Sequence, residues 1–174
     1  VEFLVEGFRA LDDPDARLLI AGDFNMVAGG SVIERVRERM QGDTRIKLLG
    51  FLPDGALDDF YASLDVFALP SVNPFEAFGI VQVEAMMRGI PVIASDLPGV
   101  RQPVLATGMG DIVQPRSAAS VTAALKRLAH TRPDVEAGAA RARALYAFDA
   151  TLDKFAAVFE EAVATAPGRP GARA

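Results

Sequence analysis

Two carboxylates stand near a predicted helix start in the middle of the chain. Glu76 falls in a loop rich in proline and asparagine, and Glu84 follows after seven intervening residues, inside an apolar stretch that predicts a helix. Gly79 lies between them, where a residue without a Cβ lets a ligand approach the backbone closely. Main-chain amides at a helix start bind phosphate. The spacing therefore predicts a site for an extended ligand, with a phosphate near Gly79 and a hydroxyl-bearing part near each acid.

Each acid also has a simpler explanation. An acid close to a helix start often only complements the helix dipole, which is the alternative for Glu76. Glu84 stands between Val83 and Ala85 in an otherwise apolar helix, where a buried acid needs a partner. The spacing alone leaves both alternatives open.

The segments around these acids predict a strand, a loop, a helix and a second strand. Apolar runs at residues 66–69 and 91–94 have the length and composition of buried strands, and the helix between them ends at residues 88–89. Two parallel strands joined through a helix form a right-handed βαβ unit, which binds ligands beyond the carboxyl ends of its strands. Both acids are therefore placed at the ligand-binding edge.

Strands and helices alternate along the rest of the chain. This order is typical of an α/β domain, with a Rossmann-like, mostly parallel sheet and helices on both faces. The predicted domain covers residues 1–165, with an irregular stretch from residue 98 to the last strand and a Pro/Gly-rich flexible tail at residues 166–174. The other predicted strands are 16–21, 46–49 and 110–114, and the other helices are 1–11, 31–40, 54–64, 117–129, 133–147 and 151–165.

Four predicted strand exits are rich in Gly, Pro, Asp or Ser and are candidates for ligand contacts. They are Gly22-Asp23-Phe24, Gly50-Phe51-Leu52, residues 71–79 and residues 95–99.

Composition and the absence of two phosphate-binding motifs weigh against several classes of protein. The formal net charge of −5 weighs against a nucleic-acid binder. The chain has no cysteine and one histidine, so a thiolate metal site and a histidine-centred triad are disfavoured. Neither a Gly-x-Gly-x-x-Gly after a strand nor a Gly-x-x-x-x-Gly-Lys-Ser/Thr occurs. No apolar run is long enough for a membrane span and no signal peptide is recognisable, so a cytoplasmic protein without membrane contact is expected.

A larger pattern resembles the retaining glycosyltransferases of family four, the "glycosyl transferases group 1", which have the GT-B fold. The resemblance covers about residues 1–130 and implies the C-terminal, nucleotide-sugar-binding half of that fold. The residues that carry it are Pro70-Ser71, Glu76-Ala77-Phe78-Gly79-Ile80, Glu84-Ala85-Met86 and Gly89-Ile90-Pro91-Val92-Ile93-Ala94-Ser95.

The resemblance implies a role for each candidate residue. Glu76 would be the catalytic residue, binding donor-sugar hydroxyls beside the reacting face, and Glu84 would hold the ribose hydroxyls. Donors in the family are UDP-, GDP- or ADP-sugars, GDP-mannose among them, and transfer is retaining and generally metal-independent, so no cofactor is expected. The remaining donor-binding residues are Phe78, Gly79 and Ile80 at the diphosphate and sugar, Gly50, Phe51 and Leu52 beside the base, and Gly22 at the neighbouring exit.

The chain departs from the family pattern in two places. The family's C-terminal half starts with a strand that ends in Gly-Arg, soon followed by Lys-Gly, whereas this chain opens in an apolar helix pattern just beyond them. We therefore expect the fold to lack its first strand, near the middle of the sheet, so that the chain is less stable or pairs its strands differently. Where the family often has Pro-Glu, residues 99–103 read Gly-Val-Arg-Gln-Pro, and Arg101 is a candidate for the missing positive charge.

The sequence favours the donor-binding domain of a glycosyltransferase that moves a sugar from a nucleotide diphosphate sugar to an acceptor with retention. Its expected partners are the donor and an N-terminal GT-B domain, without which the chain should not turn over. A non-catalytic nucleotide-sugar-binding or scaffold domain is the alternative. A sugar-nucleotide epimerase of similar fold is a third, which the paired acids disfavour.

Overall fold

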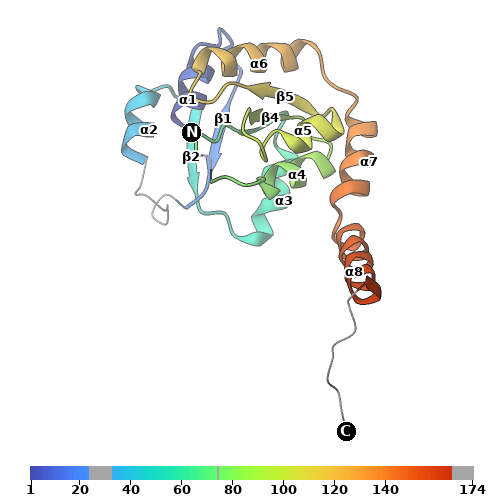
Figure 1. Ribbon diagram of the computed structural model, residues 1–174. Coiled ribbons are helices and arrows are strands. Elements are labelled where there is room, and N and C mark those ends of the chain that lie inside the picture. Colours follow the sequence, from blue (N-terminus) through green and yellow to red (C-terminus); the bar gives the residue numbers. More distant parts are fainter. Residues whose placement is uncertain (24–32, 74, 166–174) are drawn as a thin grey trace.

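The computed structural model describes residues 1–23, 33–73 and 75–165 (Figure 1). Its helices and strands alternate up to β5, after which only helices follow. In chain order the elements are α1 (Glu2–Arg9), β1 (Leu18–Ala21), α2 (Ile33–Met40), β2 (Ile46–Gly50), α3 (Asp54–Ala62), β3 (Phe67–Leu69), α4 (Ile80–Met87), β4 (Val92–Ser95), α5 (Gln102–Thr107), β5 (Gly110–Val113), α6 (Ala118–His130), α7 (Val135–Tyr146) and α8 (Phe148–Thr165).

Every strand pair in the described part of the chain is parallel. β1 pairs with β2, and β3, β4 and β5 form a second sheet in that order. Phe67 of β3 lies opposite Val92 of β4, which lies opposite Gly110 of β5. The predicted α/β class is confirmed, and the described strands form two sheets, one of β1 and β2 and one of β3, β4 and β5.

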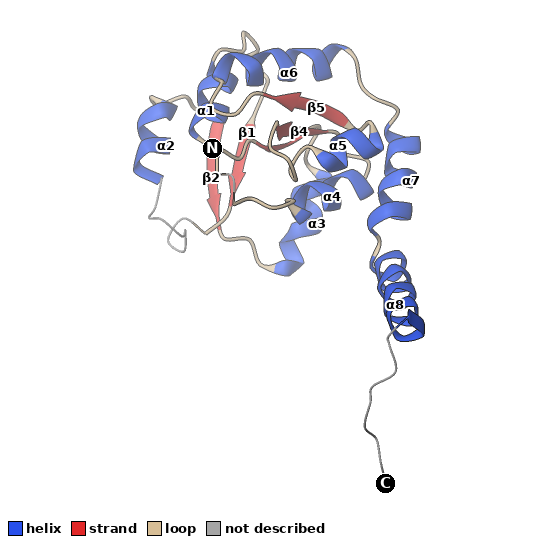
Figure 2. Ribbon diagram, in the orientation of Figure 1, coloured by secondary structure: helices blue, strands red, loops and turns tan. Residues whose placement is uncertain are grey.

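The sheet of β3, β4 and β5 is covered by helices on both faces (Figure 2). Val92 and Ala94 pack with buried residues of α4, α5 and α7 on one face. Ile93 and Val113 pack with α1 and α6 on the other. Because both faces are buried, all four residues of β4 are buried, and the strand is an uninterrupted run of small and apolar residues.

In the described part of the chain, the buried residues of β1 and β2, Ile20 and Ile46, both lie on one face of their sheet. Ile20 and Ile46 point toward α1 and α2 and pack against Phe8 and Val36. On the opposite face, the side chain of Leu49 is 40% exposed.

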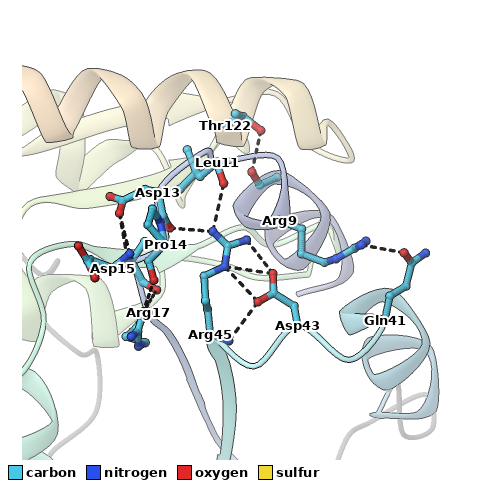
Figure 3. Close-up of polar contacts among 12 residues, drawn as sticks. Arg9, Leu11, Asp13, Pro14, Asp15, Arg17, Gln41, Asp43, Arg45 and Thr122 are labelled. Atoms are coloured by element: carbon cyan, nitrogen blue, oxygen red, sulfur yellow. Dashed lines mark hydrogen bonds and ion pairs between the residues drawn. The ribbon is translucent and has the colours of Figure 1, made fainter.

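A polar cluster around Arg45 fixes the turns that lead into these two strands (Figure 3). The cluster reaches from a partly buried position to the surface. The Arg45 guanidinium pairs with Asp43 (Nη2 to Oδ2, 2.7 Å) and donates to the main-chain oxygens of Leu11 (3.1 Å) and Asp13 (2.8 Å). It also lies over the ring of Phe8, 5.0 Å from the centroid. The hydrogen bond from Arg45 lowers the pKa of Asp43 from 3.8 to about 2. One side chain thus ties the turn after α1 to the turn after α2.

Helix α5 lies in a stretch predicted to be irregular. It is six residues long, with proline in its first turn and Gly108 in the left-handed conformation (φ 67°) after its last residue. Inside the helix, the Thr107 hydroxyl donates to the Pro103 carbonyl at 2.6 Å. A first-turn proline and a terminal glycine were the available signals, but one and a half turns are too short to show helical periodicity.

The last two helices begin differently. α7 starts after Asp134, whose side chain accepts from the Ala137 amide (3.0 Å), as a helix cap does. α8 begins three residues before its predicted start, contains no buried residue and projects away from the sheets (Figure 1). No helix in the described ranges is long and apolar enough to cross a membrane. The predicted tail at residues 166–174 lies outside the described residues, as does the predicted start of α2 at residues 31–32.

Candidate functional site

The predicted βαβ unit is present, and Gly79 forms the junction between its loop and its helix, α4. Gly79 precedes α4 with a left-handed backbone (φ 77°), and a Cβ there would lie 2.2 Å from Leu69 Cδ2 at the end of β3. Glycine is therefore required by conformation and by space. The amides of Gly79, Ile80 and Val81 have no main-chain acceptor among the described residues. Three successive free amides at a helix start form a candidate anion site.

A second loop lies directly against this one. A Cβ at Gly99 would come within 1.6 Å of the main-chain oxygen of Ala77, so the two backbones are in contact. The side chain of Gln82 spans the same contact: it is fully buried and its Nε2 donates to the carbonyls of Phe78 and Val100. Sequence reasoning missed Gln82. Its signal was an amide side chain in an otherwise apolar helix.

Glu76 lies on the loop before Gly79 and is half-buried. Its amide donates to the Asn73 carbonyl at 3.1 Å, which closes a turn. No described residue donates a hydrogen bond to its carboxylate or forms an ion pair with it. Glu76 therefore presents an acid at the carboxyl edge of β3 that can accept hydrogen bonds from a ligand.

The neighbouring residues of the loop differ in exposure. The ring of Phe78 is half-buried and meets Tyr146 of α7 edge to face, with the centroids 5.5 Å apart. Ile80 is 68% exposed. Helix α7 thus supports the loop from behind through Phe78 while the first turn of α4 stays open.

Glu84 has a partner within the protein. Its Oε2 accepts a hydrogen bond from the Tyr61 hydroxyl of α3 at 2.9 Å. Burial, the hydrogen bond to Glu84 and the charge of Glu84 all raise the pKa of Tyr61. Arg88 lies over the Tyr61 ring at 4.7 Å and pairs with Asp58 at 2.7 Å. Glu84 is half-buried, and its second oxygen, Oε1, accepts no hydrogen bond in the described part of the chain.

The other predicted donor-binding residues come from the two-stranded sheet. The Gly22 amide donates to the Gly50 carbonyl at 2.8 Å, which joins the exits of β1 and β2. Both glycines have positive φ, 143° and 73°. Phe51 is 71% exposed, and Leu52 is half-buried.

The structure therefore brings the predicted residues together in two groups. Glu76, Phe78, Gly79 and Ile80 adjoin one another, and Gly22 adjoins Gly50–Leu52. Within the described residues, no hydrogen bond, ion pair or ring contact joins these two groups. Glu84 is joined to α3 through Tyr61 instead.

Arg101, the candidate positive charge, is already paired. Its Nη1 lies 2.8 Å from Oδ1 of Asp96, just beyond the carboxyl end of β4. Both side chains are about one third exposed, so the pair can be reached by solvent. In the described ranges, no three His, Cys, Asp or Glu side chains gather in a group able to hold a metal ion.

Comparison with known proteins decides the family. The model of the family described as "Glycosyl transferases group 1" matches residues 1–144. The chain belongs to this family. The match includes the loop with Glu76 and the helix with Glu84, and so confirms the resemblance carried by these segments.

Two relatives illustrate the match. The chain is 31% identical over 157 residues to a D-inositol 3-phosphate glycosyltransferase of Geodermatophilus obscurus, covering 87% of this chain and 34% of that protein. It is 30% identical over 129 residues to an uncharacterised glycosyltransferase of Methanocaldococcus jannaschii, covering 74% of this chain and 32% of the relative. The chain thus spans about a third of the length of these relatives.

Solved structures agree on the fold. Sucrose-phosphate synthase from Thermosynechococcus elongatus superposes with a TM-score of 0.76 at 28% identity, covering 95% of this chain and 42% of that one. HepE from Anabaena, solved in complex with UDP, gives 0.74 at 23% identity, covering 91% of this chain and 44% of that one. The C-terminal domain of a group 1 glycosyltransferase from Francisella tularensis gives 0.59 at 21% identity, covering 88% of this chain and 77% of that one.

Proposed function

We propose that residues 1–165 form the nucleotide-sugar donor-binding domain of a group 1 glycosyltransferase. The observation that carries this proposal is the loop between β3 and α4. It combines a carboxylate without a partner among the described residues, Glu76, with three free amides at the start of α4. One group suits sugar hydroxyls and the other suits a diphosphate.

Each predicted residue then has a role that its environment permits. Glu76 binds hydroxyls of the donor sugar beside the reacting carbon. The amides from Gly79 onward stabilise the charge that develops on the leaving diphosphate. Oε1 of Glu84 accepts from a ribose hydroxyl while Oε2 stays bonded to Tyr61. The exposed ring of Phe51 flanks the base.

The donor is proposed to be a UDP- or GDP-sugar. HepE, a structural neighbour, has also been solved in complex with UDP-glucose, and one relative of the chain is a phosphatidyl-myo-inositol mannosyltransferase of Mycobacterium leprae. These two names point to different sugars, glucose and mannose, so a UDP-sugar and a GDP-sugar both belong in the test.

The complete enzyme is proposed to have an N-terminal GT-B domain that binds the acceptor, and to transfer the sugar with retention. Each relative named above is about three times as long as its matched segment, which leaves room for such a domain. A cytoplasmic setting is part of this proposal. By itself the chain should bind donor and transfer no sugar, because the acceptor side is absent from the proposed site.

One observation favours the alternative of a non-catalytic binding or scaffold domain. Asp96 already pairs with Arg101, so this cation is not free to neutralise a donor diphosphate. A donor site that relies on main-chain amides alone binds a dianion weakly. The scaffold form of this alternative therefore predicts that neither UDP- nor GDP-sugars bind measurably.

Calorimetric titration of the chain with UDP-glucose and GDP-mannose separates the two functions. Donor binding should fall about tenfold in Glu84→Gln, which keeps an oxygen for the Tyr61 hydroxyl but lacks the charge for ribose. Glu160→Ala, an exposed acid on α8, is the matched control and should bind like the wild type. Absence of binding by the wild type to either donor would overturn the donor-site proposal and support the scaffold.

The same samples test the lack of turnover. Wild-type chain incubated with donor and simple sugar acceptors should give no transfer product by mass spectrometry. Transfer at the rate of a longer relative would show that the acceptor side is already present.

A further inference from the structure

Gln82 is an unusual residue for its position. It lies in α4 beside the buried side chains of Val83, Ala85 and Met86, and its own side chain is fully buried. Its Nε2 donates two hydrogen bonds to main-chain carbonyls, one to Phe78 and one to Val100 (2.9 Å). Its Oε1 is also buried and accepts no hydrogen bond from the described residues. Because both partners are acceptors, the orientation of the carboxamide is fixed: Nε2 must face them.

Packing alone does not account for this side chain. A methionine would fill nearly the same volume without burying an unpaired oxygen, which is costly in a core. What the carboxamide provides, and methionine cannot, is a tie between two separate stretches of backbone. Phe78 belongs to the loop before α4, and Val100 to the loop after β4.

The tie acts where the two loops already touch. Gly99 lets the backbone of the second loop contact the Ala77 carbonyl, and Gln82 bonds to the residue that follows each of these two. The two loops are therefore held at one spacing by a main-chain contact and a pair of side-chain hydrogen bonds.

Holding the Phe78 carbonyl also orients the next amide. In a trans peptide the C=O and the N–H point in opposite directions, and no described peptide is cis. The Phe78 carbonyl points inward to Gln82, so the Gly79 N–H of the same peptide points away from α4's buried face. This N–H is the first of the three free amides of the candidate anion site.

We propose that Gln82 is a positioning residue of the donor site, which aims the Gly79 amide at the donor diphosphate by holding the Phe78 carbonyl. The inference rests on the proposed function for its ligand, but the tie between the loops can be measured without any ligand. Gln82 itself contacts no donor in this proposal, because its side chain is sealed from solvent.

The test uses Gln82→Met and a matched control, Val83→Ala, the neighbouring buried residue of the same helix. Gln82→Met should lower the thermal midpoint slightly, because the carbonyls of Phe78 and Val100 lose their donor, which outweighs the removal of the unpaired oxygen. Hydrogen exchange should become about tenfold faster at the Gln82-position and Gln102 amides, which bond to the carbonyls of Gly79 and Gly99. Affinity for the donor that binds the wild type should fall about tenfold.

Val83→Ala should also lower the thermal midpoint, because a buried side chain is truncated, but it should leave donor affinity unchanged. If Gln82→Met lowers the midpoint and leaves both exchange and affinity unchanged, Gln82 is a packing residue and the proposal is overturned. If exchange quickens but affinity is unchanged while Glu84→Gln weakens binding, the proposed function stands and positioning by Gln82 is wrong. If the wild type binds no donor, the proposed function and donor positioning fall together, and exchange alone decides whether Gln82 ties the loops.

Discussion

Each of the two sheets supports one half of the proposed donor site, but the sheets differ in how many of their faces are packed. The sheet of β3, β4 and β5 is packed on both faces and supports the loop with Glu76 and the free amides. The sheet of β1 and β2 is packed on one face and supports the exits at Gly22 and Gly50. Parallel sheets are normally buried on both faces, so the first is typical and the second is not.

The difference indicates which half of the site is preformed. On the three-stranded side, Gln82 and the contact at Gly99 fix the loops around the proposed diphosphate position. On the two-stranded side, Phe51 is 71% exposed and has no ring contact in the described part of the chain. We therefore expect the loops proposed to bind the diphosphate to keep one conformation. The conformation of the part proposed to bind the base should depend on the stability of the two-stranded sheet.

The largest expected effect that separates the sheets comes from truncating one apolar strand residue in each sheet. Ile93→Ala, at a fully buried position of β4, should lower the free energy of unfolding by about 3–4 kcal/mol, because the lost methyl groups leave a cavity between β4 and the helices α1 and α6. Leu49→Ala in β2 should cost less than about 1 kcal/mol, because this side chain is 40% exposed. Urea denaturation measures both values. Equal losses would show that the outer face of β2 is covered in solution.

A smaller effect is expected in local stability. Amides of β4 should exchange only through global unfolding, whereas those of β1 and β2 should exchange about ten to a hundred times faster through local opening of the one-sided sheet. Native-state hydrogen exchange read by NMR makes the comparison within one sample. Equal protection in the two sheets would mean that they unfold as a single unit.

The smallest expected effect is on how the stability of the fold depends on acidic pH. The pKa of Asp43 is about 2 when it is paired with Arg45, against an ordinary value of 3.8. A lowered carboxyl pKa stabilises the fold above the ordinary value, and this contribution disappears as the pH falls from about 4 to 2. Asp43→Asn should flatten the stability profile in that window and leave the profile near neutrality parallel to that of the wild type.

Leu49→Ala is the control for the stability profile at acidic pH, because this variant keeps every carboxylate of the wild type. Its urea midpoint should fall between pH 4 and pH 2 as steeply as that of the wild type. An Asp43→Asn profile that falls as steeply as the other two would show that this pair does not link the turns of the two-stranded sheet.

Much of the fold could be read from the sequence because its strands are short apolar runs between Gly- and Pro-rich turns. All five strands lie within two residues of their predicted limits. Helix α5 was missed because six residues carry no period, and the division into two sheets follows from pairing between distant strands, which no local pattern encodes.

The location of the candidate site could also be predicted from the sequence, whereas its contacts could not. The types and spacing of Glu76, Gly79 and Glu84 locate the loop and the helix start, and the structure places them there. Their roles toward a donor stay predictions. The bond between Glu84 and Tyr61 joins residues more than twenty positions apart, and the two acceptors of Gln82 are main-chain atoms, so neither contact leaves a sequence pattern.

The backbone contact at Gly99 has a consequence for how sequences of this kind can change. With 1.6 Å between a Cβ there and the Ala77 oxygen, any side chain at 99 must displace the loop that carries Glu76. Position 99 and the length or path of the Glu76 loop are therefore free to vary only together. Among homologues, a residue other than glycine at 99 should accompany insertions or deletions between β3 and α4, and a loop of the present length should accompany glycine.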